Sequence, residues 1–160
     1  MSVKENSQKI EQLLDVSLAK SSRKRSDVQI IVVTKSVSSE RAVEAIEEGY
    51  LDLAENRPEG LALKQKELSD QRLVWHFIGT LQARKVKKVI NDIDYFHALD
   101  RLTLAEEIEK RANKVVLCFV QVNVTGEETK SGVSPEQLDA FITSLSQYSK
   151  IKIVGLMTMA

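Results

Sequence analysis

The sequence predicts an α/β fold in which parallel strands alternate with helices, and within this class it favours a (β/α) barrel. Six apolar, strand-like runs occur in the 160 residues, at 30–35, 51–56, 74–79, 95–100, 115–124 and 151–159. Helical patterns separate the runs, and right-handed crossovers between parallel strands build either a doubly wound sheet or a barrel. A doubly wound nucleotide-binding sheet usually carries glycines in the turn after its first strand. The corresponding turn, residues 35–38, contains no glycine, which favours the barrel.

The chain begins with a predicted amphipathic helix at 4–20. Ser2 and Glu5 have the spacing of a capping box, which marks a helix start. The apolar stripe of this helix consists of Ile10, Leu13, Leu14 and Leu18. Such a stripe is expected to pack against the rest of the domain.

Five further helices are predicted between the strands, at 39–48, 58–69, 81–91, 101–112 and 135–147. Gly49 is expected to end the first of them as a C-terminal cap. Thr80 and Asp100 are expected to be N-caps of the third and fourth. Ser134 followed by Pro135 is typical of the start of the last helix.

A closed barrel of this type needs eight strands, and six are visible. An open arc of six strands leaves two unpaired edges, which promote association with other strands. We therefore expect residues 1–160 to form a single, incomplete barrel domain from the N-terminal portion of a longer, monomeric protein. The alternative is self-association of this chain through its open edges.

Composition excludes several function classes. Hydrophobic residues make up 42% of the chain and charged residues 29%, and 23 basic side chains balance 23 acidic ones. This balance predicts no nucleic-acid or membrane partner, and the one basic cluster, residues 84–88, is predicted to be a solvated helix face. The polar N-terminus is not a signal peptide, and a single cysteine, Cys118, fits a reducing compartment. We therefore expect a cytoplasmic protein.

Lys35 is the most informative residue in the sequence. It ends a run of valine and isoleucine that is typical of a strand buried on both faces. Lysine is seldom buried without a partner, and where it is, desolvation favours the neutral, nucleophilic amine found in Schiff-base lysines. The alternative is that the strand ends at Thr34 and that Lys35 extends into water.

Other polar residues lie along the strands. In the run 115–124 one face is entirely apolar and includes Cys118, which we expect in the core, so Gln121 and Asn123 should point into the barrel. Their amides need partners there, and these are either a ligand or a structural layer of hydrogen bonds. His76 and His97 lie within strands, where a histidine is usually a core residue, and no cysteine or carboxylate has metal-ligand spacing to them.

Six motifs follow one another along residues 4–160 and carry a resemblance to a known family. They are Val33-Thr34-Lys35; Ala54-Glu55-Asn56-Arg57; Trp75-His76-Phe77-Ile78-Gly79-Thr80-Leu81-Gln82; His97-Ala98-Leu99-Asp100; Gln121-Val122-Asn123-Val124 with Lys130-Ser131-Gly132; and Gly155-Leu156-Met157-Thr158-Met159. Each motif alone is weak. Together, in this order, they resemble the pyridoxal phosphate homeostasis proteins.

The resemblance implies a (β/α)8 barrel like the N-terminal domain of alanine racemase, with pyridoxal 5′-phosphate bound as a Schiff base on the lysine that matches Lys35. It also implies that Asn56, His76 and Met157 line the ring side of the cofactor pocket. The family has no established catalytic turnover and is thought to store and deliver the cofactor. No metal is implied.

Two departures from the family pattern affect the pocket. The family's Gly-Glu-Asn is Ala54-Glu55-Asn56 here, which adds a methyl group that could crowd the cofactor. Family members also continue for two more strands, which carry the phosphate cradle and the contact to the pyridine nitrogen. We therefore expect residues 1–160 alone to hold the cofactor weakly.

Two other functions are compatible with the sequence. The first is a racemase or decarboxylase that uses the same barrel and cofactor, which would need an acid–base group on the opposite face of the cofactor ring. The second is a structural fragment that only dimerises or binds another protein through its open edges.

Overall fold

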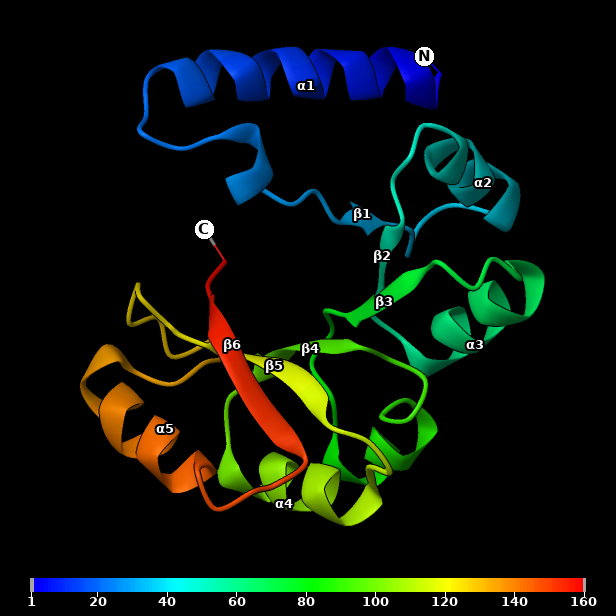
Figure 1. The fold of residues 1–160 in the computed structure, drawn as a ribbon. Coiled ribbons are helices and arrows are strands. Elements are labelled where there is room, and N and C mark those ends of the chain that lie inside the picture. Colours follow the sequence, from blue (N-terminus) through cyan, green and yellow to red (C-terminus); the bar gives the residue numbers. More distant parts are fainter. Residues whose placement is uncertain (1, 160) are drawn as a thin grey trace.

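The strands of the sheet lie side by side in chain order. The computed structural model describes residues 2–159, which form one six-stranded sheet of order β1-β2-β3-β4-β5-β6 (Figure 1). The strands are β1 (Val32–Val33), β2 (Asp52–Glu55), β3 (Val74–Phe77), β4 (Tyr95–Leu99), β5 (Val116–Gln121) and β6 (Ile151–Met157). Every neighbouring pair is parallel. The order never reverses, as it would in a doubly wound sheet, so right-handed crossovers place their helices on one side. This is the predicted barrel-type arrangement.

Five helices and three short 3-10 helices connect these strands. The α-helices are α1 (Val3–Ala19), α2 (Ser39–Glu47), α3 (Pro58–Glu67), α4 (Leu102–Arg111) and α5 (Leu138–Leu145). The 3-10 helices are η1 (Arg25–Asp27), η2 (Ala83–Lys88) and η3 (Pro135–Gln137). None of the helices within residues 2–159 is both long enough and apolar enough to cross a membrane.

The hydrophobic core lies between one face of the sheet and the helices. Its fully buried residues include Leu53, Phe77, Phe96, Val116, Cys118 and Val120 from the strands and Leu61, Leu104, Ala105 and Ile108 from α3 and α4. Cys118 is a core residue as predicted, and burial raises the pKa of its thiol to about 12, so it stays protonated. We call the other side of the sheet the open face.

The first predicted strand is shorter and less buried than its sequence indicates. Only Val32 and Val33 of the run 30–35 pair with β2, and Val33 is 47% exposed. Within the described residues β1 is an edge strand with a neighbour on one side only. The prediction of burial on both faces is therefore wrong at this strand, because a β-branched run does not reveal how many neighbours a strand has.

The segment 81–91 is not the α-helix that its pattern predicts. It contains only η2, and its apolar residues Val86, Val89 and Ile90 are buried, whereas Lys87 and Lys88 are exposed. Basic side chains three and four positions apart repel one another in an α-helix, and β-branched residues favour it little. The prediction that the basic cluster is solvated is confirmed.

Two of the predicted helix caps are present in the structure and two are not. Ser2 and Glu5 form the expected capping box, and Gly49 follows α2 with φ of 93°. Thr80 and Asp100 are not N-caps: Asp100 instead accepts a hydrogen bond from Arg101, the residue at the N-cap position of α4. A sequence identifies capping residues only by their type and spacing. At Asp100 the carboxylate is engaged by the neighbouring Arg101 and does not cap the helix.

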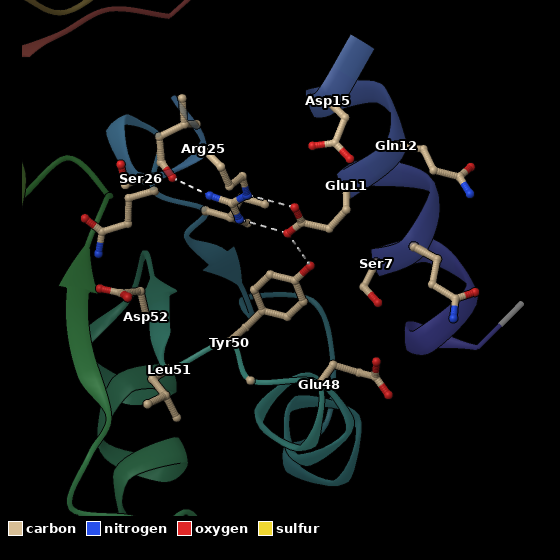
Figure 2. A pocket seen from close by; sticks show the side chains of 15 residues that line it. Ser7, Glu11, Gln12, Asp15, Arg25, Ser26, Glu48, Tyr50, Leu51 and Asp52 are labelled. Atoms are coloured by element: carbon tan, nitrogen blue, oxygen red, sulfur yellow. Dashed lines mark hydrogen bonds and ion pairs between the residues drawn. The ribbon is translucent and has the colours of Figure 1, made fainter. Parts of the chain in front are cut away.

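Helix α1 lies apart from the sheet and is held by polar contacts (Figure 2). Arg25 donates hydrogen bonds of 2.8 and 2.9 Å to the carboxylate of Glu11, which also accepts one of 3.3 Å from the hydroxyl of Tyr50. The predicted packing of the apolar stripe holds only in part, because Leu14 and Leu18 are half-buried but Ile10 and Leu13 are 48% and 69% exposed. A cavity of about 940 Å³ adjoins these contacts at the N-terminal ends of β1 and β2. The active sites of barrel proteins lie at the C-terminal ends of the strands, which is the end opposite to this cavity.

Candidate functional site

Lys35 lies in a tight turn directly after β1. The backbone N–H of Thr34 donates to the carbonyl of Ala54 at 2.9 Å, and the N–H of Val37 donates to the carbonyl of Thr34 at 3.1 Å, which closes the turn. Thr34 is fully buried, whereas Lys35 is exposed. β1 ends at Val33, one residue earlier than the alternative interpretation had it, and Lys35 is exposed as that interpretation expected.

Strand register places His76 on the open face, and Lys35 and Asn56 follow strand residues of that face. Val33 is opposite Ala54, and Ala54 is opposite His76, so these residues share one face. The Thr34 side chain points the other way and donates to Glu55 at 2.7 Å. Successive side chains alternate between faces. Lys35 and Asn56 come two residues after Val33 and Ala54, just beyond the C-terminal ends of β1 and β2.

Met157, the fourth predicted site residue, lies at the far side of the sheet. It ends β6, pairs with Gln121 and is half-buried against the core. Four strands separate β6 from β1 in the sheet order. The described residues therefore place Lys35 and Asn56 just after β1 and β2 and His76 within the neighbouring β3, whereas Met157 belongs to the opposite edge strand.

Asn56 is held in place by the segment that follows the next strand. A side-chain Cβ at Gly79 would lie 2.3 Å from the backbone oxygen of Asn56, so the two backbones touch where only glycine fits. The N–H of Ile78 also donates to the carbonyl of Glu55 at 2.9 Å. The ends of β2 and β3 are thus fixed against each other, and Asn56 has little freedom to shift.

His76 is part of a buried hydrogen-bonded chain on the open face. Its Nε2 lies 2.9 Å from the Asp52 carboxylate, and its Nδ1 lies 2.8 Å from Nε2 of His97. If Nε2 of His76 donates its hydrogen bond to Asp52, Nδ1 of a neutral His76 accepts one from Nε2–H of His97. Burial lowers the pKa of His76, and burial together with the neighbouring His76 lowers the pKa of His97 to about 4. Both rings are therefore neutral at pH 7.

Aromatic rings pack around this chain. Tyr95 stacks on His76 with ring centroids 4.5 Å apart, and Phe119 lies 4.6 Å from His97. Tyr95, Phe119 and Asp52 are parts of the site that the motifs did not include, whereas His97 opens one of the motifs without an assigned role. Period-two alternation, applied to the runs 51–56 and 95–100 as it was to 115–124, would have put them on the face of His76.

The amides of Gln121 and Asn123 serve the structure of a loop. Gln121 donates to the carbonyl of Ser131 at 3.2 Å. Asn123 donates to the carbonyls of Glu127 and Lys130, at 2.8 and 3.3 Å. The structural alternative is therefore supported, and a ligand is not needed to satisfy these groups. Within residues 2–159 no group of three histidine, cysteine or carboxylate side chains could hold a metal ion.

Comparison with known proteins identifies a family model and several relatives that match this chain. The family model described as "Alanine racemase, N-terminal domain" matches residues 15–160. A pyridoxal phosphate homeostasis protein of Aquifex aeolicus is 40% identical over 134 residues, which are 82% of this chain and 59% of that protein. One of Pseudomonas aeruginosa is 30% identical over 161 residues, which are 98% of this chain and 70% of that protein. The chain thus spans part of the length of these relatives.

A solved structure shares the fold over most of the chain. PipY of Synechococcus elongatus, without PLP, superimposes with a TM-score of 0.81 at 31% identity and covers 94% of this chain and 70% of PipY. The structure of PipY with PLP bound superimposes with a TM-score of 0.77 at 32% identity. Alanine racemase of Clostridium difficile is 20% identical with a TM-score of 0.69, which shows the fold alone.

Proposed function

Because this chain belongs to the alanine racemase N-terminal domain family, and within it to the pyridoxal phosphate homeostasis proteins, we propose that it binds pyridoxal 5′-phosphate through a Schiff base on Lys35. The observation that carries the proposal is the place of this amine, exposed in the turn after β1 at the C-terminal edge of the sheet. The PLP-bound structure of PipY supports the choice of cofactor.

The described residues fit the ring end of such a cofactor. The Lys35 side chain is exposed and the half-buried Asn56 is held by Gly79, whereas His76 is 1% exposed and supports the site from within the sheet. Ala54, the departure from the family motif, is fully buried, so its methyl group does not line accessible space. Among the four site residues Lys35 is the only cation, and it is engaged in the proposed bond. The phosphate therefore needs other groups to hold it.

The proposed binding requires only one reversible reaction from this chain. Pyridoxal 5′-phosphate supplies an aldehyde that condenses with a primary amine. The unprotonated Nζ of Lys35 would form the new C=N bond, and its two protons would leave with the aldehyde oxygen as one water molecule. Asn56 offers amide donors and an acceptor to orient the ring, and His76 is held in one orientation by Asp52 and His97. Reversal by water releases the cofactor, which suits storage and delivery by the whole protein.

Replacing Lys35 by alanine is expected to remove the imine absorption band that appears when the cofactor is added to wild-type protein. The reason is that no other described lysine combines exposure with a place at the end of β1. Spectrophotometric titration of both proteins checks the prediction, and Lys66→Ala, at an exposed lysine of α3, is the control. A band of undiminished amplitude in Lys35→Ala would contradict the assignment.

We further propose that the protein has no racemase turnover. Exchange at Cα needs an acid–base group on the second face of the ring, and His76 and His97 are neutral groups that already hydrogen-bond to each other. Incubation of cofactor-loaded protein with L- and D-alanine in deuterated water is expected to give exchange no faster than free cofactor gives. Exchange at the rate of an alanine racemase run alongside would favour the enzyme.

The proposed location is the cytoplasm, and the proposed working form of the full-length protein is a monomer. The balanced charge and the buried thiol of Cys118 support the location. Residues 1–160 alone present β1 and β6 as edge strands, which could pair with a second copy. Size-exclusion chromatography with light scattering distinguishes the two states.

A further inference from the structure

A buried lysine on α3 contacts the turn that carries Lys35. Lys64 is 5% exposed, and its ammonium group lies 2.6 Å from the carbonyl oxygen of Val37 and 3.3 Å from that of Thr34. These two carbonyls stand on either side of Lys35 along the chain. One side chain thus ties both ends of the turn to a helix that is distant in sequence.

A buried carboxylate completes the arrangement. Glu55 is 2% exposed, accepts the hydroxyl of Thr34 at 2.7 Å and pairs with the ammonium of Lys64 at 3.6 Å. Gly60, also on α3, leaves space for this carboxylate, because a Cβ there would lie 2.7 Å from its second oxygen. Thr34 is therefore held through its side chain by Glu55 and through its carbonyl by Lys64.

A buried ion pair is rarely the best way to stabilise a protein, because desolvation of both charges offsets their attraction. Apolar side chains of the same volume would fill this space, but they could not donate to two backbone carbonyls at once. The contacts that only an ammonium group can make are those to Thr34 and Val37. This points to the geometry of the turn as the property that the pair provides.

We propose that Lys64 and Glu55 are positioning residues that fix the turn of residues 34–37 and thereby direct the Lys35 amine toward the cofactor aldehyde. The inference rests on the proposed function for its purpose, but the fixed turn is a property of the cofactor-free protein. A displacement of about 1 Å in the position of a reacting group is enough to weaken a reaction strongly. The pair thus acts through Lys35 and does not touch the cofactor itself.

The test compares three variants with the wild type. Lys64→Met removes the charge and both contacts to the turn. The double variant Glu55→Gln with Lys64→Met leaves no unpaired buried charge, so it stays informative if Lys64→Met alone does not fold. Lys66→Met is the matched control, since it removes an exposed lysine from the same helix. Each protein is measured for amide hydrogen exchange of residues 34–38 without cofactor, and for the dissociation constant of pyridoxal 5′-phosphate from its imine band.

The double variant is expected to exchange the amides of residues 34–38 at least about tenfold faster than the wild type, and to bind the cofactor about tenfold more weakly. Lys66→Met should change neither, and exchange in the core strands should be the same in all folded variants. Unchanged exchange at 34–38 would overturn the inference whether or not the cofactor binds. Faster exchange with unchanged binding would overturn the link to Lys35. Absence of an imine band in the wild type would instead refute the proposed function.

Discussion

Gly79→Ala is expected to destabilise the fold by about 3 kcal/mol and to weaken cofactor binding, although it adds a single methyl group. The new Cβ would lie 2.3 Å from the backbone oxygen of Asn56 and 2.9 Å from its carbonyl carbon. Both atoms are backbone, so the ends of β2 and β3 would have to separate. Asn56 would then move relative to His76 on the open face. Denaturant unfolding and cofactor titration measure the two effects.

A glycine in open space provides the control for this variant. Gly126 has nothing within 4 Å of a Cβ, but its φ of 72° disfavours alanine. Gly126→Ala is therefore expected to cost about 1 kcal/mol through backbone strain alone and to leave cofactor binding unchanged. A loss of stability in Gly79→Ala no greater than in Gly126→Ala would show that contact with Gly79 does not hold Asn56.

Lowering the pH from 6.5 to 4 is expected to cost the protein up to about 3 kcal/mol of stability through His97. Burial lowers the pKa of His97 from 6.5 to about 4 in the folded state. Between these values the unfolded chain binds a proton that the folded chain excludes, so the stabilisation is complete above pH 6.5 and is lost as the pH falls toward 4. A protonated His97 can still donate from Nε2 to Nδ1 of His76, so the cost comes from charging a buried ring.

The contribution of His97 to the pH dependence is obtained by comparing the wild type with a variant that lacks this titrating group. In His97→Gln the amide can still donate to Nδ1 of His76 but does not titrate. Unfolding free energies of both proteins, measured by denaturant at intervals between pH 4 and 7.5, should fall more toward the acidic end in the wild type than in the variant. The same dependence on pH in both proteins would show that His97 is not the group responsible.

The order of elements could be predicted from the sequence because it depends on local patterns. All six strand runs contain an observed strand, and the glycine-free turn at residues 35–38 correctly favoured the barrel arrangement. The errors occur where the length or the exposure of an element depends on residues that are distant in the sequence. The length of β1 depends on its single partner strand, and the exposure of Ile10 and Leu13 depends on what α1 packs against. Neither is encoded in the segment itself.

The candidate site was predictable in part for the same reason. Lys35, Asn56 and His76 follow from strand ends and motifs, and the structure places them within or just after adjacent strands. The chain from Asp52 through His76 to His97 joins three strands, and the contact of Lys64 with Val37 spans 27 residues. Such contacts depend on strand register and helix packing. A lysine within a helix gives no sign in the sequence that its ammonium group is buried.

The most direct test of the account is to locate the bond between protein and cofactor. One equivalent of pyridoxal 5′-phosphate is added to the protein, the imine is reduced with borohydride, and the adduct is mapped by peptide mass spectrometry. The account predicts that the adduct is found on Lys35 and that Lys35→Ala leaves only a low level spread over exposed lysines. An adduct concentrated on another lysine, or spread evenly over many in the wild type, would contradict it.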